Sequence, residues 1–176
     1  KKKMVINPAQ IGASISQAKD ALSAVRGQID QLIASGVDVS PAEQKYSEAS
    51  SAIHSAETAS DYSKAQQSLN TANAAIAEAE VLARELGIQK GINDVDAVIG
   101  QANALITDFR VNRSMSSDPR LTPIILAYDN AANLVSTAKD ELSRKEYDQA
   151  VAKTYDARVK ADEALAEALK LKEQLD

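Results

Sequence analysis

The sequence predicts an all-α fold, built as two tandem antiparallel three-helix bundles that comprise residues 1–87 and residues 88–176. First, apolar residues alternate at spacings of three and four along six segments, which places each set on one stripe of an α-helix. Second, the six segments read as two copies of a three-segment unit, and no segment shows the alternation typical of a strand. Third, 32 of the 176 residues are Ala, whereas Leu, Ile, Val and Phe together number 39, so the predicted cores are slim.

The first helix is predicted from an apolar stripe between a start signal and a turn. Asn7-Pro8 followed by Gln10 is typical of a helix N-terminus, and Ser35-Gly36 is typical of a helix end. The stripe consists of Ile11, Ile15, Ala18, Leu22, Val25, Ile29 and Leu32.

The second helix is preceded by a distinct start signal. Ser40-Pro41-Ala42-Glu43 predicts a capping box, in which the Ser40 hydroxyl and the Glu43 carboxylate each accept a hydrogen bond from a backbone N–H. Its stripe consists of Tyr46, Ala49, Ile53 and Ala56.

The third and fourth stripes meet at a shift of phase. The third, capped by Ser60 or Asp61, consists of Tyr62, Ala65, Leu69, Ala72, Ile76, Ala79, Ala83 and Leu86. The fourth consists of Ile88, Ile92, Val95, Ile99, Ala102, Ile106 and Phe109. The phase slips by two residues at Gly87, about 200° around a helix, so either the chain turns there or one helix presents its stripe to opposite sides. The absence of Pro or a turn dipeptide favours the continuous helix.

The fifth and sixth helices repeat the pattern of the second and third. The fifth stripe, which follows Asp118-Pro119, consists of Leu121, Ile124, Tyr128, Ala131, Val135, Ala138 and Leu142. Ser143 with Glu146 predicts a second capping box. The sixth stripe consists of Tyr147, Ala150, Thr154, Ala157, Ala161, Ala164, Ala168, Leu171 and Leu175. The tyrosines at positions 46, 62, 128 and 147 begin equivalent heptads in the two copies, so we expect structural roles for them near bundle ends.

Composition excludes several classes of function. The chain has 20 Lys and Arg against 25 Asp and Glu, mixed along its length, so it lacks the basic face that binding to nucleic acid needs. With no Cys, it has no disulfide, thiolate metal site or Cys nucleophile. No run approaches the about 18 apolar residues of a membrane span, so we expect no direct membrane insertion of this segment. We expect a monomer without a cofactor or metal.

Catalytic groups are also missing from the pattern. His54 is the single histidine and follows the core residue Ile53, so we expect it on the surface. The carboxylate pairs Asp94/Asp96 and Glu78/Glu80 are two residues apart and therefore lie on different helix faces. No Gly-rich phosphate loop or nucleophile motif occurs, and we expect that the protein is not an enzyme.

Two loops at equivalent corners of the two copies are candidate recognition surfaces. The segment Asn112-Arg113-Ser114 fits the N-glycosylation sequon and lies in the longest predicted loop, which makes Asn112 a candidate glycosylation site. Loops carry recognition residues more often than packed elements do. The candidate interaction residues are Val37, Asp38, Met115, Asp118 and Arg120.

Three motifs of the first copy resemble a known class of module. They are Leu32 to Ser40, Tyr-x-x-Ala at Tyr46 to Ala49, and Asp-Tyr-x-x-Ala-x-x-x-Leu-x-x-Ala at Asp61 to Ala72. The chain resembles the Ala-rich helical modules of archaeal and bacterial surface or membrane-anchored proteins, with a plan similar to spectrin-type tandem repeats. The second copy lacks the Gly-x-Asp-x-Ser turn at Arg110 to Leu121. The resemblance implies no catalytic residue.

The leading hypothesis is a non-enzymatic, elongated helical spacer or protein-interaction module, in the extracytoplasmic part of a surface or membrane-anchored protein. Its protein partner is not identified by the sequence. The alternative is a helical sensor domain that binds a small solute between helices. Polar residues on a core stripe would indicate the sensor, and Thr154 is the one such residue. A third hypothesis is a cytoplasmic adaptor whose exposed helix face docks a partner helix.

Overall fold

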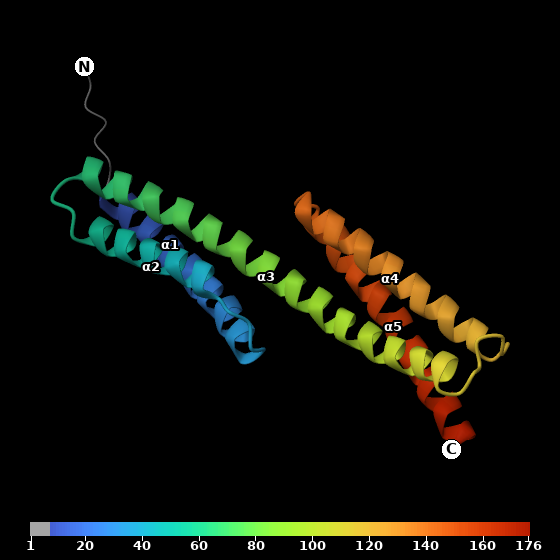
Figure 1. Ribbon diagram of the computed structural model, residues 1–176. Helices are drawn as coiled ribbons and strands as arrows, with labels where there is room; N and C mark the ends of the chain where they lie inside the picture. The colour runs from blue at the N-terminus through green and yellow to red at the C-terminus, as the bar shows by residue number, and fades with distance from the viewer. Residues whose placement is uncertain (1–7) are drawn as a thin grey trace. The chain divides into compact units, whose positions relative to one another are not determined.

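The computed structural model describes residues 8–176, with side chains from Gln10 onward, and 87% of these residues are helical. This range contains five helices and no strand (Figure 1): α1 (Pro8–Ala34), α2 (Ser40–Glu57), α3 (Tyr62–Val111), α4 (Leu121–Ser143) and α5 (Tyr147–Leu175). The predicted all-α class is therefore confirmed. The predicted cap at Asn7 lies outside the described residues.

Five helices account for six predicted segments because the third and fourth stripes share α3. This helix has 50 residues and passes Gly87 and Gly91 without interruption. By its internal contacts the chain divides into two compact units, Lys1–Gly87 and Ile88–Asp176, which we call the first and second units. Helix α3 contributes buried residues to both, in the two phases that the sequence indicates.

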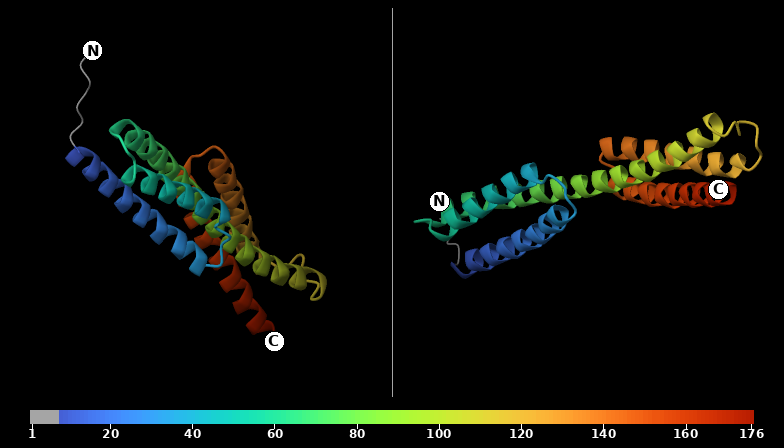
Figure 2. Two further views of the ribbon diagram at one scale, coloured as in Figure 1. Left: turned by 90° about the vertical axis from the view of Figure 1, so that its left-hand side faces the viewer. Right: turned by 60° about the horizontal axis from the view of Figure 1, so that its bottom comes forward.

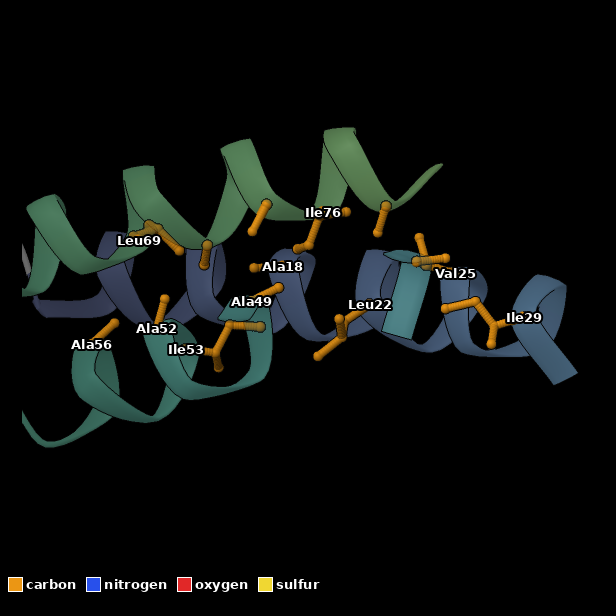
Figure 3. Close-up of a cluster of buried hydrophobic side chains, with 14 of the residues drawn as sticks. Ala18, Leu22, Val25, Ile29, Ala49, Ala52, Ile53, Ala56, Leu69 and Ile76 are labelled. Atoms are coloured by element: carbon orange, nitrogen blue, oxygen red, sulfur yellow. The ribbon is translucent and has the colours of Figure 1, made fainter. Parts of the chain in front are cut away.

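The core of the first unit is formed by α1, α2 and the N-terminal part of α3 (Figure 3). Val25 and Ile29 of α1 are fully buried. The fully buried residues of the other two segments are all alanines: Ala42, Ala49, Ala72 and Ala79. Small side chains let helix axes approach closely, so the larger residues of α1 fill a narrow core.

Helix α1 ends at the predicted turn. Gly36 has a φ of 80°, in the left-handed region that glycine adopts without steric cost. The Gly36 N–H donates to the Ile33 carbonyl at 2.9 Å, and the Val37 N–H donates to the Leu32 carbonyl at 3.0 Å. This pair of hydrogen bonds is the Schellman motif, which satisfies carbonyls that the helix leaves open.

The start of α2 differs from the predicted capping box. The Ser40 hydroxyl donates to Asp38 Oδ1 at 2.5 Å, and the Ser40 N–H donates to the same oxygen at 3.0 Å. Glu43 instead accepts from Arg26 Nη2 of α1 at 3.1 Å. The capping box is wrong because the Ser40 N–H donates to Asp38 instead of Glu43, and the Glu43 N–H donates to the Val39 carbonyl at 2.9 Å instead of the Ser40 hydroxyl.

The core of the second unit is formed by the C-terminal part of α3 together with α4 and α5, which lie side by side (Figures 1 and 2). Phe109 and Ile92 of α3 are fully buried and Leu121 of α4 nearly so. All fully buried residues of α5 are alanines: Ala150, Ala157, Ala161, Ala164 and Ala168. Alanine therefore lines one side of this core too.

Two features of α4 and its turn correct the sequence analysis. Ala127 and Glu141 are buried, whereas the predicted stripe residues Tyr128 and Leu142 are only half-buried. Ala127 lies three residues after the buried Ile124, and Glu141 lies three residues after the buried Ala138, so both still follow the helical spacing of three and four. The second capping box is also absent: the Ser143 hydroxyl donates to the Asp140 carbonyl at 2.6 Å, and Glu146 accepts from Arg144 Nε at 3.2 Å.

Candidate functional site

The loop between α3 and α4 is fixed at its first residues by charged side chains. Asn112 is exposed, and its Nδ2 donates to Asp108 Oδ1 at 2.7 Å. Arg113 donates from Nε to Asp108 Oδ2 at 3.2 Å and from Nη2 to Asp176 Oδ1 at 2.8 Å. The Asn112 and Arg113 side chains hold the pKa of Asp108 below its ordinary value. Attachment of a glycan at Asn112 would require its amide to release Asp108.

Met115 anchors this loop instead of pointing outward. Its side chain is only 8% exposed and packs with Phe109, Leu121 and Leu171. Its N–H donates to the Phe109 carbonyl at 2.9 Å. Ser114, directly before it, has a φ of 53°, so the chain turns sharply to bring Met115 inward. Of the three candidate residues in this loop, Asp118 and Arg120 remain available for contact.

Asp118 and Arg120 form a two-pronged ion pair at the start of α4. Arg120 Nη2 lies 2.6 Å from Asp118 Oδ2, and its Nε lies 3.1 Å from Oδ1. The Arg120 N–H also donates to Oδ1 at 2.9 Å. These hydrogen bonds to the ionised form lower the pKa of Asp118 to about 2. The pair presents one fixed cation and one fixed anion at the surface.

The equivalent corner of the first unit presents Asp38 and shields Val37. Asp38 is exposed, and its hydrogen bonds from Ser40 lower its pKa. Val37 is half-buried against the core of the first unit, and its neighbour Val39 is fully within that core. Of the two candidate residues at this corner, Asp38 therefore offers its carboxylate to a partner, whereas Val37 is partly covered.

Two ion pairs elsewhere join neighbouring helices of the same unit. Glu78 accepts from Lys45 Nζ at 2.8 Å, and Asp96 accepts from Lys139 Nζ at 3.0 Å. His54 is exposed. Within residues 8–176, no three His, Asp or Glu side chains converge on a point that would hold a metal ion.

The tyrosines divide into two groups. Tyr46 is half-buried with the Arg26 guanidinium 5.1 Å above its ring, and the Tyr62 hydroxyl donates to Gln66 Oε1 at 3.0 Å. Tyr128 packs against the core of the second unit. Tyr155 differs, because 70% of it is exposed. The sequence analysis missed Tyr155 because it sought one apolar stripe per helix.

The described surface includes two open grooves that lie between helices. One, of about 1000 Å³, lies between α2 and α3 in the first unit and is lined largely by hydroxyls, among them Ser47, Ser51 and Ser68. The other, of about 310 Å³, lies between the start of α4 and the end of α5 and includes Arg120, Ile124 and Lys170. Both are open to solvent, so neither encloses a small molecule.

Glu141 is the second residue that the sequence analysis missed. It is 5% exposed, and its Oε2 is buried without a hydrogen-bond partner among the described residues. A buried polar atom left unpaired costs free energy, so native proteins seldom contain one without a reason. The signal in the sequence was its position three residues after the core residue Ala138.

No protein-family model, curated protein or solved structure shows a significant match to the chain. Among the described residues, no helix is both long enough and apolar enough to traverse a lipid bilayer.

Proposed function

We propose that the chain is a non-enzymatic helical spacer and protein-interaction module, in which α3 joins two antiparallel three-helix bundles in series. The strongest support is α3 itself, which runs as one helix from Tyr62 to Val111 and supplies buried residues to both compact units. A straight helix of that length spans about 75 Å. A spacer needs such a continuous helix because the helix keeps the two ends of the module at a fixed separation.

The exposed surface supports the interaction part of the proposal. The two grooves are open, and the large exposed side chains include Tyr155 at 70% and Leu126 at 61%. Helix faces of this kind bind other helices through rows of apolar side chains. The partner is therefore another protein.

We place this module in the extracytoplasmic part of a surface or membrane-anchored protein, on the resemblance of its first copy to Ala-rich surface modules. The exposed sequon at Asn112 fits that location. A cytoplasmic adaptor would use the same helix faces. An export signal encoded in the full gene distinguishes the two, since an adaptor would have none.

Small-angle X-ray scattering with in-line light scattering tests the spacer directly. Two bundles in series predict a monomer with a maximum dimension of about 80 Å. A radius of gyration of about 16 Å, which is typical of a compact domain of this length, would contradict the spacer proposal.

A second candidate function rests on Glu141. Its buried, unpaired Oε2 is the kind of core polar atom that a helical sensor would use to bind a small cationic solute. Native mass spectrometry of the purified chain tests this candidate. A stoichiometric bound solute that is lost in Glu141→Gln supports the sensor, and an unliganded mass in both proteins counts against it.

A further inference from the structure

The turn that joins α4 to α5 buries very little apolar surface. We call residues 139–149 the α4–α5 corner; Ala138 before it and Ala150 after it are both fully buried. Within the corner, the one buried residue is Glu141. The two apolar residues of the corner, one in each helix, are only half-buried. Local opening of the corner would therefore expose little apolar surface, and the loss of such burial is what opposes local unfolding.

The buried side chain of the corner is held there at a cost in free energy. Glu141 is 5% exposed, and its Oε2 lacks a hydrogen-bond partner among the described residues. A carboxylate is strongly hydrated in water, so its burial removes hydration that no protein group replaces. Unwinding of the last turn of α4 would return Glu141 to water and recover that free energy.

A second cost lies in the backbone of the turn. Lys145 has a φ of 63°, in the left-handed region, where a β-carbon is strained. Its N–H donates to the Leu142 carbonyl at 3.0 Å. The next N–H, of Glu146, donates to the Glu141 carbonyl at 2.9 Å. The end of α1 has the same pair of hydrogen bonds around Gly36, so the two helix ends share one motif, but that of α4 places a β-carbon at the left-handed position.

The corner between α2 and α3 in the first unit carries neither cost. Asp61 directly precedes α3, as Glu146 directly precedes α5. Asp61 Oδ1 accepts from the Lys64 N–H at 2.8 Å and so caps α3, whereas the Glu146 side chain forms no cap hydrogen bond. Residues 57–64 include no left-handed residue and no buried polar side-chain atom without a partner. This first-unit corner is therefore a reference within the same chain.

We propose that the α4–α5 corner is a conformational device that opens locally: the last turn of α4 and the first turn of α5 unwind together while the rest of the second unit stays folded. Opening relieves the buried carboxylate of Glu141 and the left-handed backbone of Lys145. The fully buried Ala138 and Ala150 limit it on either side. A partner that prefers the open or the closed corner would shift the equilibrium between them. The device goes beyond the spacer function and does not rest on it.

Native-state hydrogen exchange of the full chain, measured by NMR at single amides, tests the proposal. The informative amides are those of Arg144 and Ala150 in the α4–α5 corner and of Thr58 and Ala65 at the first-unit corner. Each donates to the carbonyl four residues before it, so the two pairs are matched. Relative to the slowest amides of its own unit, we expect the first pair to be at least about tenfold less protected than the second.

Substitutions separate the two causes of opening. Glu141→Leu is expected to raise the protection of Arg144 and Ala150 about tenfold, because a buried leucine needs no hydrogen-bond partner. Lys145→Gly is compared with Lys145→Ala, since both lose the lysine side chain and only the β-carbon differs between them. Glycine is expected to raise the same protection about fivefold over alanine. The control Asp129→Leu, at an exposed position of α4, should leave it unchanged.

Three results would overturn the proposal. Arg144 and Ala150 exchange as slowly as the slowest amides of the second unit, which would mean that the corner opens only with the whole unit. The two corners show the same relative protection. Glu141→Leu leaves the protection of Arg144 unchanged or lowers it. The comparison of the two corners needs no substitution, so it decides the proposal even where circular dichroism shows that a variant has lost its helices.

Discussion

Gly91 of α3 lies directly against Thr154 of α5, because a β-carbon on Gly91 would come within 3.3 Å of Thr154 Cγ2. The Thr154 hydroxyl donates to the Ala150 carbonyl at 2.7 Å, within its own helix. The one polar residue of the predicted core stripes is thus satisfied locally. Glycine at position 91 lets α3 and α5 approach closely at this point.

This contact separates two glycines of the same helix. Gly100→Ala is expected to raise the free energy of unfolding by up to about 1 kcal/mol, since alanine favours a helix and nothing lies within 4 Å of the new methyl group. Gly91→Ala is expected to give no such gain, because its methyl group presses on Thr154. Urea denaturation of both variants checks this, and equal gains would contradict the close contact.

The buried carboxylate of Glu141 is expected to reduce stability. Glu141→Leu should raise the free energy of unfolding by about 1 to 3 kcal/mol, because it removes an unpaired buried acceptor and adds apolar contacts. Asp129→Leu, on the exposed face of the same helix, is the matched control and should change stability by less than about 0.5 kcal/mol. Loss of stability in Glu141→Leu would indicate that Oε2 has a partner in solution.

The turn after α1 depends on the left-handed backbone of Gly36. Gly36→Ala is expected to lower the free energy of unfolding by about 1 kcal/mol, because a β-carbon is strained at a φ of 80°. Gly27→Ala, within α1 and with open space around it, should instead be stabilising. Thermal unfolding by circular dichroism compares them, and a shift in the same direction for both would contradict the turn geometry.

The Asp118 carboxyl is expected to titrate near pH 2 in the folded protein, below its ordinary value of 3.8. Because the pKa of the folded state is lowered, the stabilisation from ionised Asp118 is present above the unfolded pKa and is lost as pH falls toward 2. NMR titration of the side-chain carboxyl measures this. In Arg120→Ala the midpoint should return toward the ordinary value, and an unchanged midpoint would show that Arg120 is not its cause.

The sequence predicted helix positions well because apolar spacing is a local signal that packing then reinforces. Helices α3, α4 and α5 begin at Tyr62, Leu121 and Tyr147, the first residues of their predicted stripes. The predictions of both capping boxes were wrong because other groups, outside the four-residue motif, form hydrogen bonds with its side chains or backbone. At α2 these groups are Asp38 and Arg26.

The candidate site was predicted only in part. Position in a loop suggested exposure for Met115, yet its apolar side chain is stabilised more by packing beside Phe109 than by solvent contact. Glu141 escaped notice because a heptad repeat assigned the core position to Leu142. Tyr155 escaped because it lies outside the predicted core stripe of α5, and residues outside that stripe were not considered.

The central claim of the proposed spacer is that α3 continues as one helix past Gly87, and a distance measurement within it is the most direct test. The chain has no Cys, so the double variant Ala77→Cys, Gln101→Cys takes up spin labels at these two positions alone. Both positions are exposed on α3. Pulsed electron–electron double resonance should give a narrow distribution of distances between the labels, centred on about 36 Å, the length of the intervening helix. Gly87→Pro, which interrupts the helix, should broaden this distribution. A broad or much shorter distribution in the chain without the proline would contradict a continuous α3 and, with it, the spacer.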